Sequence, residues 1–96
     1  NAHSEGCYSR AIGESSHAEG HDTEANGHCA HAEGYKTTAT YYAHAEGYQT
    51  STYIDGEYAH VEGYQTTAMG GYSHAEGYLT KTFKIGSHAE GTSTYS

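Results

Sequence analysis

The chain has 96 residues, 34% of them hydrophobic, and a formal net charge of −8 with histidine counted neutral. Eleven residues are tyrosine and large aliphatic side chains are scarce, so a monomeric globule could not bury a sizeable core. The negative charge argues against a nucleic-acid partner, and no apolar run is long enough for membrane insertion. No signal peptide is visible and residue 1 is asparagine, so we expect residues 1–96 to be a single repeat domain from a longer fibrous protein.

From the N-terminus onward, the phrase small-His-small-Glu-Gly occurs seven times. The successive histidines are 14, 14, 13, 16, 14 and 14 residues apart, at His3, His17, His31, His44, His60, His74 and His88. A fixed period this short is the signature of an array in which each unit stacks on the next.

Each 14-residue unit divides into two halves of seven residues. The segments 9–13, 16–20 and 23–27 all read small-x-Ala-x-Gly. Alternation over five positions predicts a short strand, and a glycine followed by polar residues predicts a turn. Two strands and two turns per unit predict one coil of an all-β solenoid. About seven coils stacked ~4.8 Å apart would give a rod ~34 Å long.

The small residues of each unit fall into columns that we expect to face the interior of the coil. The residues on either side of each histidine are small, and a second column is a hydroxyl ladder made of Ser9, Thr23, Thr37, Thr50, Thr66, Thr80 and Thr94. Such an interior is thin and buries little apolar area, so some other surface must cover one face of the roll. The histidines and glutamates are uniform from unit to unit, which favours a symmetric oligomer as that cover.

The units 16–20, 30–34 and 87–91, together with the half-repeat 9–13, resemble the head repeats of trimeric autotransporter adhesins. Similar repeats occur in phage tail and tail-fibre proteins. The resemblance covers nearly the whole chain and implies a homotrimeric, left-handed parallel β-roll with 14-residue coils. It also implies attachment to a host surface or extension of a fibre. No ligand residue of the family can be matched to a position in this chain.

Histidine and glutamate stand where the better-known adhesin heads carry the aliphatic residues of their trimer centre. If the trimer forms, we therefore expect its interface to be a polar ladder of hydrogen-bonded side chains. This ladder consists of His3, Glu5, His17, Glu19, His31, Glu33, His44, Glu46, His60, Glu62, His74, Glu76, His88 and Glu90.

Nine histidines also raise two chemical alternatives. The pairs His17 with His21 and His28 with His31 are the candidates for a zinc, nickel or iron site. We favour structural hydrogen bonding between each histidine and its glutamate, and therefore expect no metal and no cofactor. His-Glu pairs also serve in acid-base catalysis, but seven equivalent copies along a rod predict architecture and not an enzyme.

Tyrosines recur at two phases of the repeat. One set follows the glycine, at Tyr35, Tyr48, Tyr64 and Tyr78, and the other precedes the small-His pair, at Tyr42, Tyr58 and Tyr72. We expect the rings to stack along the rod near the turns. Packing between chains is the favoured interpretation, and an exposed aromatic strip that binds a glycan or a protein receptor is the alternative.

The register breaks in the middle of the chain, where one step is short and the next is long. The longer step contains the segment Tyr53, Ile54, Asp55, Gly56 and Glu57. Insertions in solenoids form loops on one face, often the binding face. We predict that this segment protrudes and that Tyr53, Ile54, Asp55 and Glu57 contact a receptor, with a harmless turn variation as the alternative.

Three classes of function remain. The first is a non-enzymatic segment of an adhesin or phage tail fibre, which would be extracellular, on a bacterial surface or a virion tail, with a host protein or glycan as partner. The second is a self-polymerising extracellular filament, and the third is an ice-binding solenoid suggested by the threonine ladder. Cys7 and Cys29 lie at different phases, so we favour two small buried thiols over an intrachain disulfide.

Overall fold

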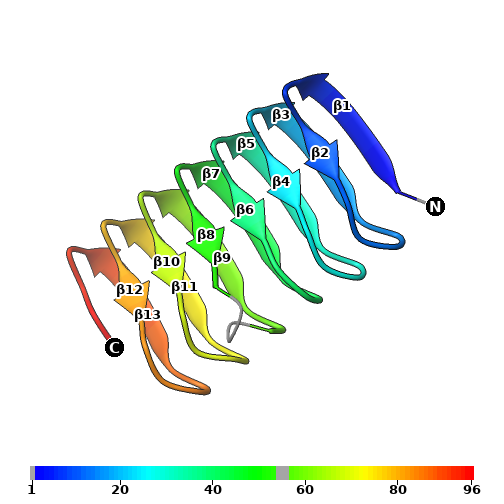
Figure 1. Cartoon of the computed structure of the whole chain (residues 1–96). Coiled ribbons are helices and arrows are strands. Elements are labelled where there is room, and N and C mark those ends of the chain that lie inside the picture. The colour runs from blue at the N-terminus through cyan, green and yellow to red at the C-terminus, as the bar shows by residue number, and fades with distance from the viewer. Residues whose placement is uncertain (1, 54–56) are drawn as a thin grey trace.

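The computed structural model describes residues 2–53 and 57–96 and shows an all-β parallel solenoid of about six turns with a repeat near 14 residues (Figure 1). Five-residue and two-residue strands alternate along the described residues. The five-residue strands are β1 (His3–Cys7), β3 (His17–His21), β5 (His31–Tyr35), β7 (His44–Tyr48), β9 (His60–Tyr64), β11 (His74–Tyr78) and β13 (His88–Thr92). The two-residue strands are β2 (Arg10–Ala11), β4 (Glu24–Ala25), β6 (Thr38–Ala39), β8 (Ser51–Thr52), β10 (Thr67–Ala68) and β12 (Lys81–Thr82).

The strands form two parallel sheets, one on each side of a flat rod. The odd-numbered strands make a seven-stranded sheet in chain order, and the even-numbered strands make a six-stranded sheet. Like residues lie beside like residues, so His17 pairs with His31 and Glu19 with Glu33. The rod measures 34 × 21 × 12 Å, which agrees with the length expected from strand spacing. The solenoid predicted from the repeat is therefore confirmed.

Glycine is the fourth of the five residues in each long strand, where two coils approach closely. Gly34 has a φ of +115°, and a Cβ atom on it would overlap the carbonyl oxygen of Gly47 in the next coil. Only glycine tolerates both the backbone conformation and the contact. The glycine column thus allows the five-residue strands to stack in register.

The interior contains the small side chains that the columns predict. Val61 and six threonines are the largest side chains that are fully buried, and the rest of the core is mainly alanine. The threonines Thr23, Thr37, Thr50, Thr66 and Thr80 lie inside the roll. Because this ladder is buried, it does not present hydroxyl groups to solvent as an ice-binding face requires.

The irregular steps fall in one kind of link, between a two-residue strand and the next long strand. Residues 26–30 form a regular link of five residues, 40–43 a link of four, and 53–59 a link of seven. In the short link, the Thr40 amide donates to Thr52 Oγ1 at 2.8 Å. Near the end of the long link, the Tyr58 amide donates to the Tyr41 carbonyl at 3.2 Å. The differences in chain length are confined to these two links, so β7 and β9 remain paired in full register.

None of the described residues belongs to a helix with the length and apolar character needed to cross a membrane.

Candidate functional site

The outer surface of the seven-stranded sheet carries a uniform set of side chains, which we call the His-Glu face. Residues alternate between the two sides of a strand, so Ala18 points inward while His17 and Glu19 point outward. The face consists of His3, Glu5, His17, Glu19, His31, Glu33, His44, Glu46, His60, Glu62, His74, Glu76, His88 and Glu90. The five inner histidines are 35–39% exposed, against 55–59% at the two end coils.

The imidazole rings of this face stack in one column along the rod. Neighbouring ring centroids lie 4.6–4.8 Å apart, which is the spacing of the strands beneath them. Each Nε2 lies 3.6–3.9 Å from a carboxylate oxygen of the glutamate two residues on. These separations are longer than a hydrogen bond.

The Nε2 atoms of the inner coils consequently have no partner. They are buried and unpaired in His17, His31, His44, His60 and His74. The hydrogen bond that the sequence predicts between each histidine and its own glutamate is therefore not made within the chain. The physical reason is that stacking at the strand spacing restricts the orientation of each ring, so its nitrogen stops short of the carboxylate. Leaving such an atom unpaired costs about 1–3 kcal/mol, which makes this face the strongest candidate for binding.

The glutamates form a second column in which carboxyl groups of successive coils meet. Contact with the Glu33 and Glu62 carboxyl groups, together with partial burial, raises the pKa of Glu46 to about 7. Contact with Glu46 is the main cause that lowers the pKa of Glu33 from its ordinary value. The pKa of Glu62 is also lowered, chiefly by Glu76 and then by Glu46. A protonated Glu46 between two carboxylates accounts for these directions.

Burial also lowers the pKa of His44, and its neighbours His31 and His60 add to this effect. A positive charge on one ring of the stack would lie about 5 Å from the next ring. His44 therefore favours the neutral imidazole, which is the form that accepts hydrogen bonds.

Four groups of side chains on this face have the donor types of a transition-metal site, with ligand atoms within 4.8 Å of one another. They are His17-Glu19-His31, His31-Glu33-His44, His60-Glu62-His74 and His74-Glu76-His88. The sequence candidates His17 and His31 thus meet in one group. His21 and His28 lie elsewhere, since His21 stacks on Tyr35 and His28 on Tyr41.

The tyrosines form two stacked columns near the turns. In the first, His21, Tyr35, Tyr48, Tyr64 and Tyr78 stack with ring centroids 4.8–5.1 Å apart and nearly parallel planes. In the second, Tyr42, Tyr58 and Tyr72 stack at 4.9–5.0 Å. Apart from the half-buried Tyr35, these tyrosines are exposed. The columns are therefore ordered and accessible at the same time.

The sequence did not predict the backbone conformation of the second tyrosine column. Tyr42, Tyr58 and Tyr72 have φ values of 54°, 61° and 56°, in the left-handed region. That conformation costs a non-glycine residue roughly 1–2 kcal/mol, and a stacked aromatic pair contributes roughly 0.5–1.5 kcal/mol. Stacking thus offsets part of the strain in this column. Ser15 and Cys29 have the same left-handed φ at the same phase, so the turn imposes this conformation whatever the side chain.

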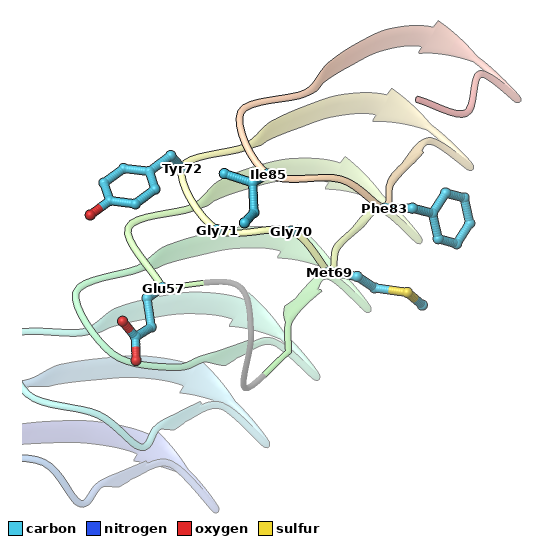
Figure 2. Close-up of a pocket in the computed structure, with 7 residues that line it drawn as sticks. All are labelled: Glu57, Met69, Gly70, Gly71, Tyr72, Phe83 and Ile85. Carbon is cyan, nitrogen blue, oxygen red and sulfur yellow. The ribbon is translucent and has the colours of Figure 1, made fainter.

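Glu57, the last residue of the predicted protruding segment, lies at an open pocket of about 510 Å³. Glu57, Met69, Gly70, Gly71, Tyr72, Phe83 and Ile85 line it. Figure 2 shows the Gly70-Gly71 backbone between Tyr72 and Glu57 on one side and Met69 and Phe83 on the other. Tyr53 and Glu57 are exposed, as the prediction requires, whereas Ile54 and Asp55 lie outside the described residues. Sequence reasoning missed this pocket, whose signal was the large apolar residues at otherwise polar positions.

The two cysteines are free and exposed, so the prediction of buried thiols was wrong. Cys29 lies in a turn with a φ of 54°, and Cys7 ends the first strand, whose residues are exposed throughout.

Comparison of the chain with protein-family models, curated proteins and solved structures finds no match. Inferences about its function therefore rest on the geometry of the His-Glu face, the tyrosine columns and the pocket.

Proposed function

We propose that this chain is a non-enzymatic structural and attachment segment of an extracellular trimeric fibre, either a bacterial adhesin or a phage tail fibre. The observation that carries the proposal is the straight, in-register stack of coils around a thin interior. A stack of this kind resists bending along its length and presents the same surface at every level. Both properties suit a rod that holds a binding surface away from its base.

Association follows from the thinness of the roll. The buried side chains are alanine, serine, threonine and one valine, which remove little apolar area from water. At roughly 25 cal/mol per Å², such an interior leaves a lone chain marginal. The His-Glu face is flat, polar and uniform, so three copies of a left-handed roll packed around a common axis would each bury it. This trimer is part of the proposal.

Attachment is assigned to surfaces outside the His-Glu face, namely the tyrosines that end the long strands and the irregular link after β8. The exposed rings of Tyr48, Tyr64 and Tyr78 and the side chains of Tyr53 and Glu57 offer aromatic and carboxylate groups to a host protein or glycan. Aromatic side chains with a polar end are enriched in binding surfaces because they supply contact area at low entropic cost.

A filament subunit is the alternative, since the like-with-like register of the sheets would let β13 of one copy pair with β1 of the next, His88 beside His3. Enzymatic activity has no comparable support. The same His-Glu pair recurs at every level, and the pocket at Tyr72 is lined by none of these pairs.

The test is the solution mass of the chain at neutral pH with a chelator present, measured by light scattering after size exclusion. A discrete mass of three chains supports the trimer, a broad and growing mass supports the filament, and a monomer contradicts both.

A pair of matched variants locates the interface. Glu33→Lys places a positive charge on the His-Glu face, whereas Thr38→Lys places one on β6, beside Glu24. We expect Glu33→Lys to lower the mass to that of one chain and Thr38→Lys to leave it at three. Equal masses for the two variants would contradict the assignment of this face.

A further inference from the structure

The unpaired histidine nitrogens require a partner that the chain does not supply. Five Nε2 atoms are buried without a hydrogen bond, all at the same phase of the repeat. Each lies beside a carboxylate oxygen at a distance too long for a hydrogen bond. A nitrogen and an oxygen at this separation have room for an ion between them.

The distances approach those of ligands around one transition-metal ion. Zinc binds imidazole nitrogen at about 2.0–2.1 Å and carboxylate oxygen at about 2.0–2.2 Å in a tetrahedron, so two of its ligands lie roughly 3.3–3.5 Å apart. The His74 Nε2 and the Glu76 carboxylate, 3.6 Å apart, are close to this separation. The second histidine of each group completes a set within 4.8 Å. Side-chain rotations that move these atoms by roughly 1–1.5 Å would close the site.

We propose that the His-Glu face binds divalent transition-metal ions of the zinc class, each held by two histidines of successive coils and the glutamate of the first. Two nitrogens and one oxygen are the donors that such ions prefer, and three protein ligands leave a fourth position open to water.

The charge of the face favours a cation. The glutamates of successive coils repel one another, and the chain carries a net charge of −8. An ion between a histidine pair would neutralise the nearest carboxylate. Electrostatics and donor chemistry therefore point to the same occupant.

The arrangement also predicts how many ions bind. The first two groups share His31, and the last two share His74. One Nε2 serves one ion, so groups that share a histidine exclude each other and the chain holds two ions. Glu46 lies between the second and third groups and belongs to none of the four found among the described residues. The N-terminal site is therefore separate from the C-terminal one.

The proposal requires only one chain and does not rest on the trimer. Its test is calorimetric titration of zinc chloride into the full chain after removal of metals with a chelator and dialysis at pH 7.5. We expect two zinc ions per chain. His31→Gln and His74→Gln should each remove one, by weakening that site at least about tenfold, and the double variant should remove both.

The matched control is the double variant His21→Gln with His28→Gln, which removes the same number of imidazoles from positions outside the groups. It should still bind two ions. Cobalt substitution adds a direct readout, because visible absorption bands of a His-ligated ion should appear in the control and vanish in the His31→Gln, His74→Gln double variant. If that double variant does not fold, Glu33→Gln combined with Glu19→Gln tests the N-terminal site by the same titration.

Equal zinc binding in the two double variants would overturn the proposal, as would absence of binding to the wild-type chain. The solution mass, taken with chelator before each titration, keeps the two proposals separate. A monomer that binds two ions contradicts the trimer alone, and a trimer that binds none contradicts the metal site alone.

Discussion

The two sides of the rod differ in how strictly their residues repeat, although segments of the two sides alternate along the chain. On the long-strand side, every coil repeats histidine, a small residue, glutamate and glycine in strict register. On the other side, the links vary from four to seven residues and carry exposed apolar side chains such as Phe83 and Ile85. The difference shows that pairing in register constrains a whole long strand, whereas in the links close backbone contact with the next coil recurs at single positions such as Gly27 and Gly70. The other link positions vary in residue type and in number.

Glycine substitutions test this contrast with the largest expected effect. Gly34→Ala on the long-strand side forces a Cβ into the Gly47 carbonyl of the next coil, so we expect a loss of at least about 4 kcal/mol in the free energy of unfolding. Gly86→Ala, in a link, meets nothing within 4 Å. Its φ of +72° should cost only about 1–2 kcal/mol. Urea unfolding at one fixed protein concentration measures both, and equal losses would contradict the contrast.

Interior volume gives the next largest effect. Ala32→Leu inserts a large side chain between the two sheets, where alanine is fully buried, and should destabilise the chain by about 1–3 kcal/mol or more. Thr38→Leu adds a side chain of the same kind on the outer side of β6 and should change stability by less than about 0.5 kcal/mol. Thermal unfolding followed by circular dichroism compares them. A tolerated leucine at position 32 would mean that the roll is wider than its alanine core indicates.

The tyrosine columns differ in backbone strain, and glycine substitutions measure that difference. Tyr64→Gly removes two stacked neighbours from a strand and should cost about 1–3 kcal/mol. Tyr58→Gly also removes two stacked neighbours but relieves a left-handed φ of 61°, so its net effect should be within about 1 kcal/mol of zero. Urea unfolding of the pair tests this. If Tyr58→Gly were as destabilising as Tyr64→Gly, stacking alone would set the stability of both columns.

The parts of this fold that the sequence predicts are those fixed by the repeat. The 14-residue period, the inward alanines and threonines and the stacking of Tyr35 on Tyr48 all follow from residues recurring at one phase. The lack of a hydrogen bond from each imidazole to its glutamate could not be predicted, because it depends on ring orientation within the stack. Nor could the pocket at Tyr72, since it depends on how links of unequal length lie beside one another. The repeat in the sequence predicts which residues stack in a column. The orientation of the side chains within that column determines which hydrogen bonds they make.

The glutamate column should make the long-strand side sensitive to pH in the absence of metal, through Glu46. Its pKa of about 7 in the folded chain exceeds its ordinary value of 4.5, so the folded state holds more protons between these values. The stability that this proton provides is present below pH 4.5 and is lost as pH rises through 7. Glu46→Gln cannot lose a proton and keeps a donor for Glu33 and Glu62. We therefore expect it to match the wild type at pH 5 and to melt at a higher temperature at pH 8, with chelator present.

Glu33, Glu62 and His44 also titrate, but comparing Glu46→Gln with the wild type controls for their effects on stability. Glu33 and Glu62 have lowered pKa values, so their contributions are lost only below about pH 4.5, outside the window. His44, whose pKa is lowered from 6.5, destabilises both proteins alike as the pH falls below that value. Glu46→Ala removes the charge and the donor together, so its gain at pH 8 should be smaller than that of Glu46→Gln. Equal gains would show that relief of repulsion acts alone. A Glu46→Gln variant that melted below the wild type at pH 8 would mean that the column is stable with every carboxyl group ionised.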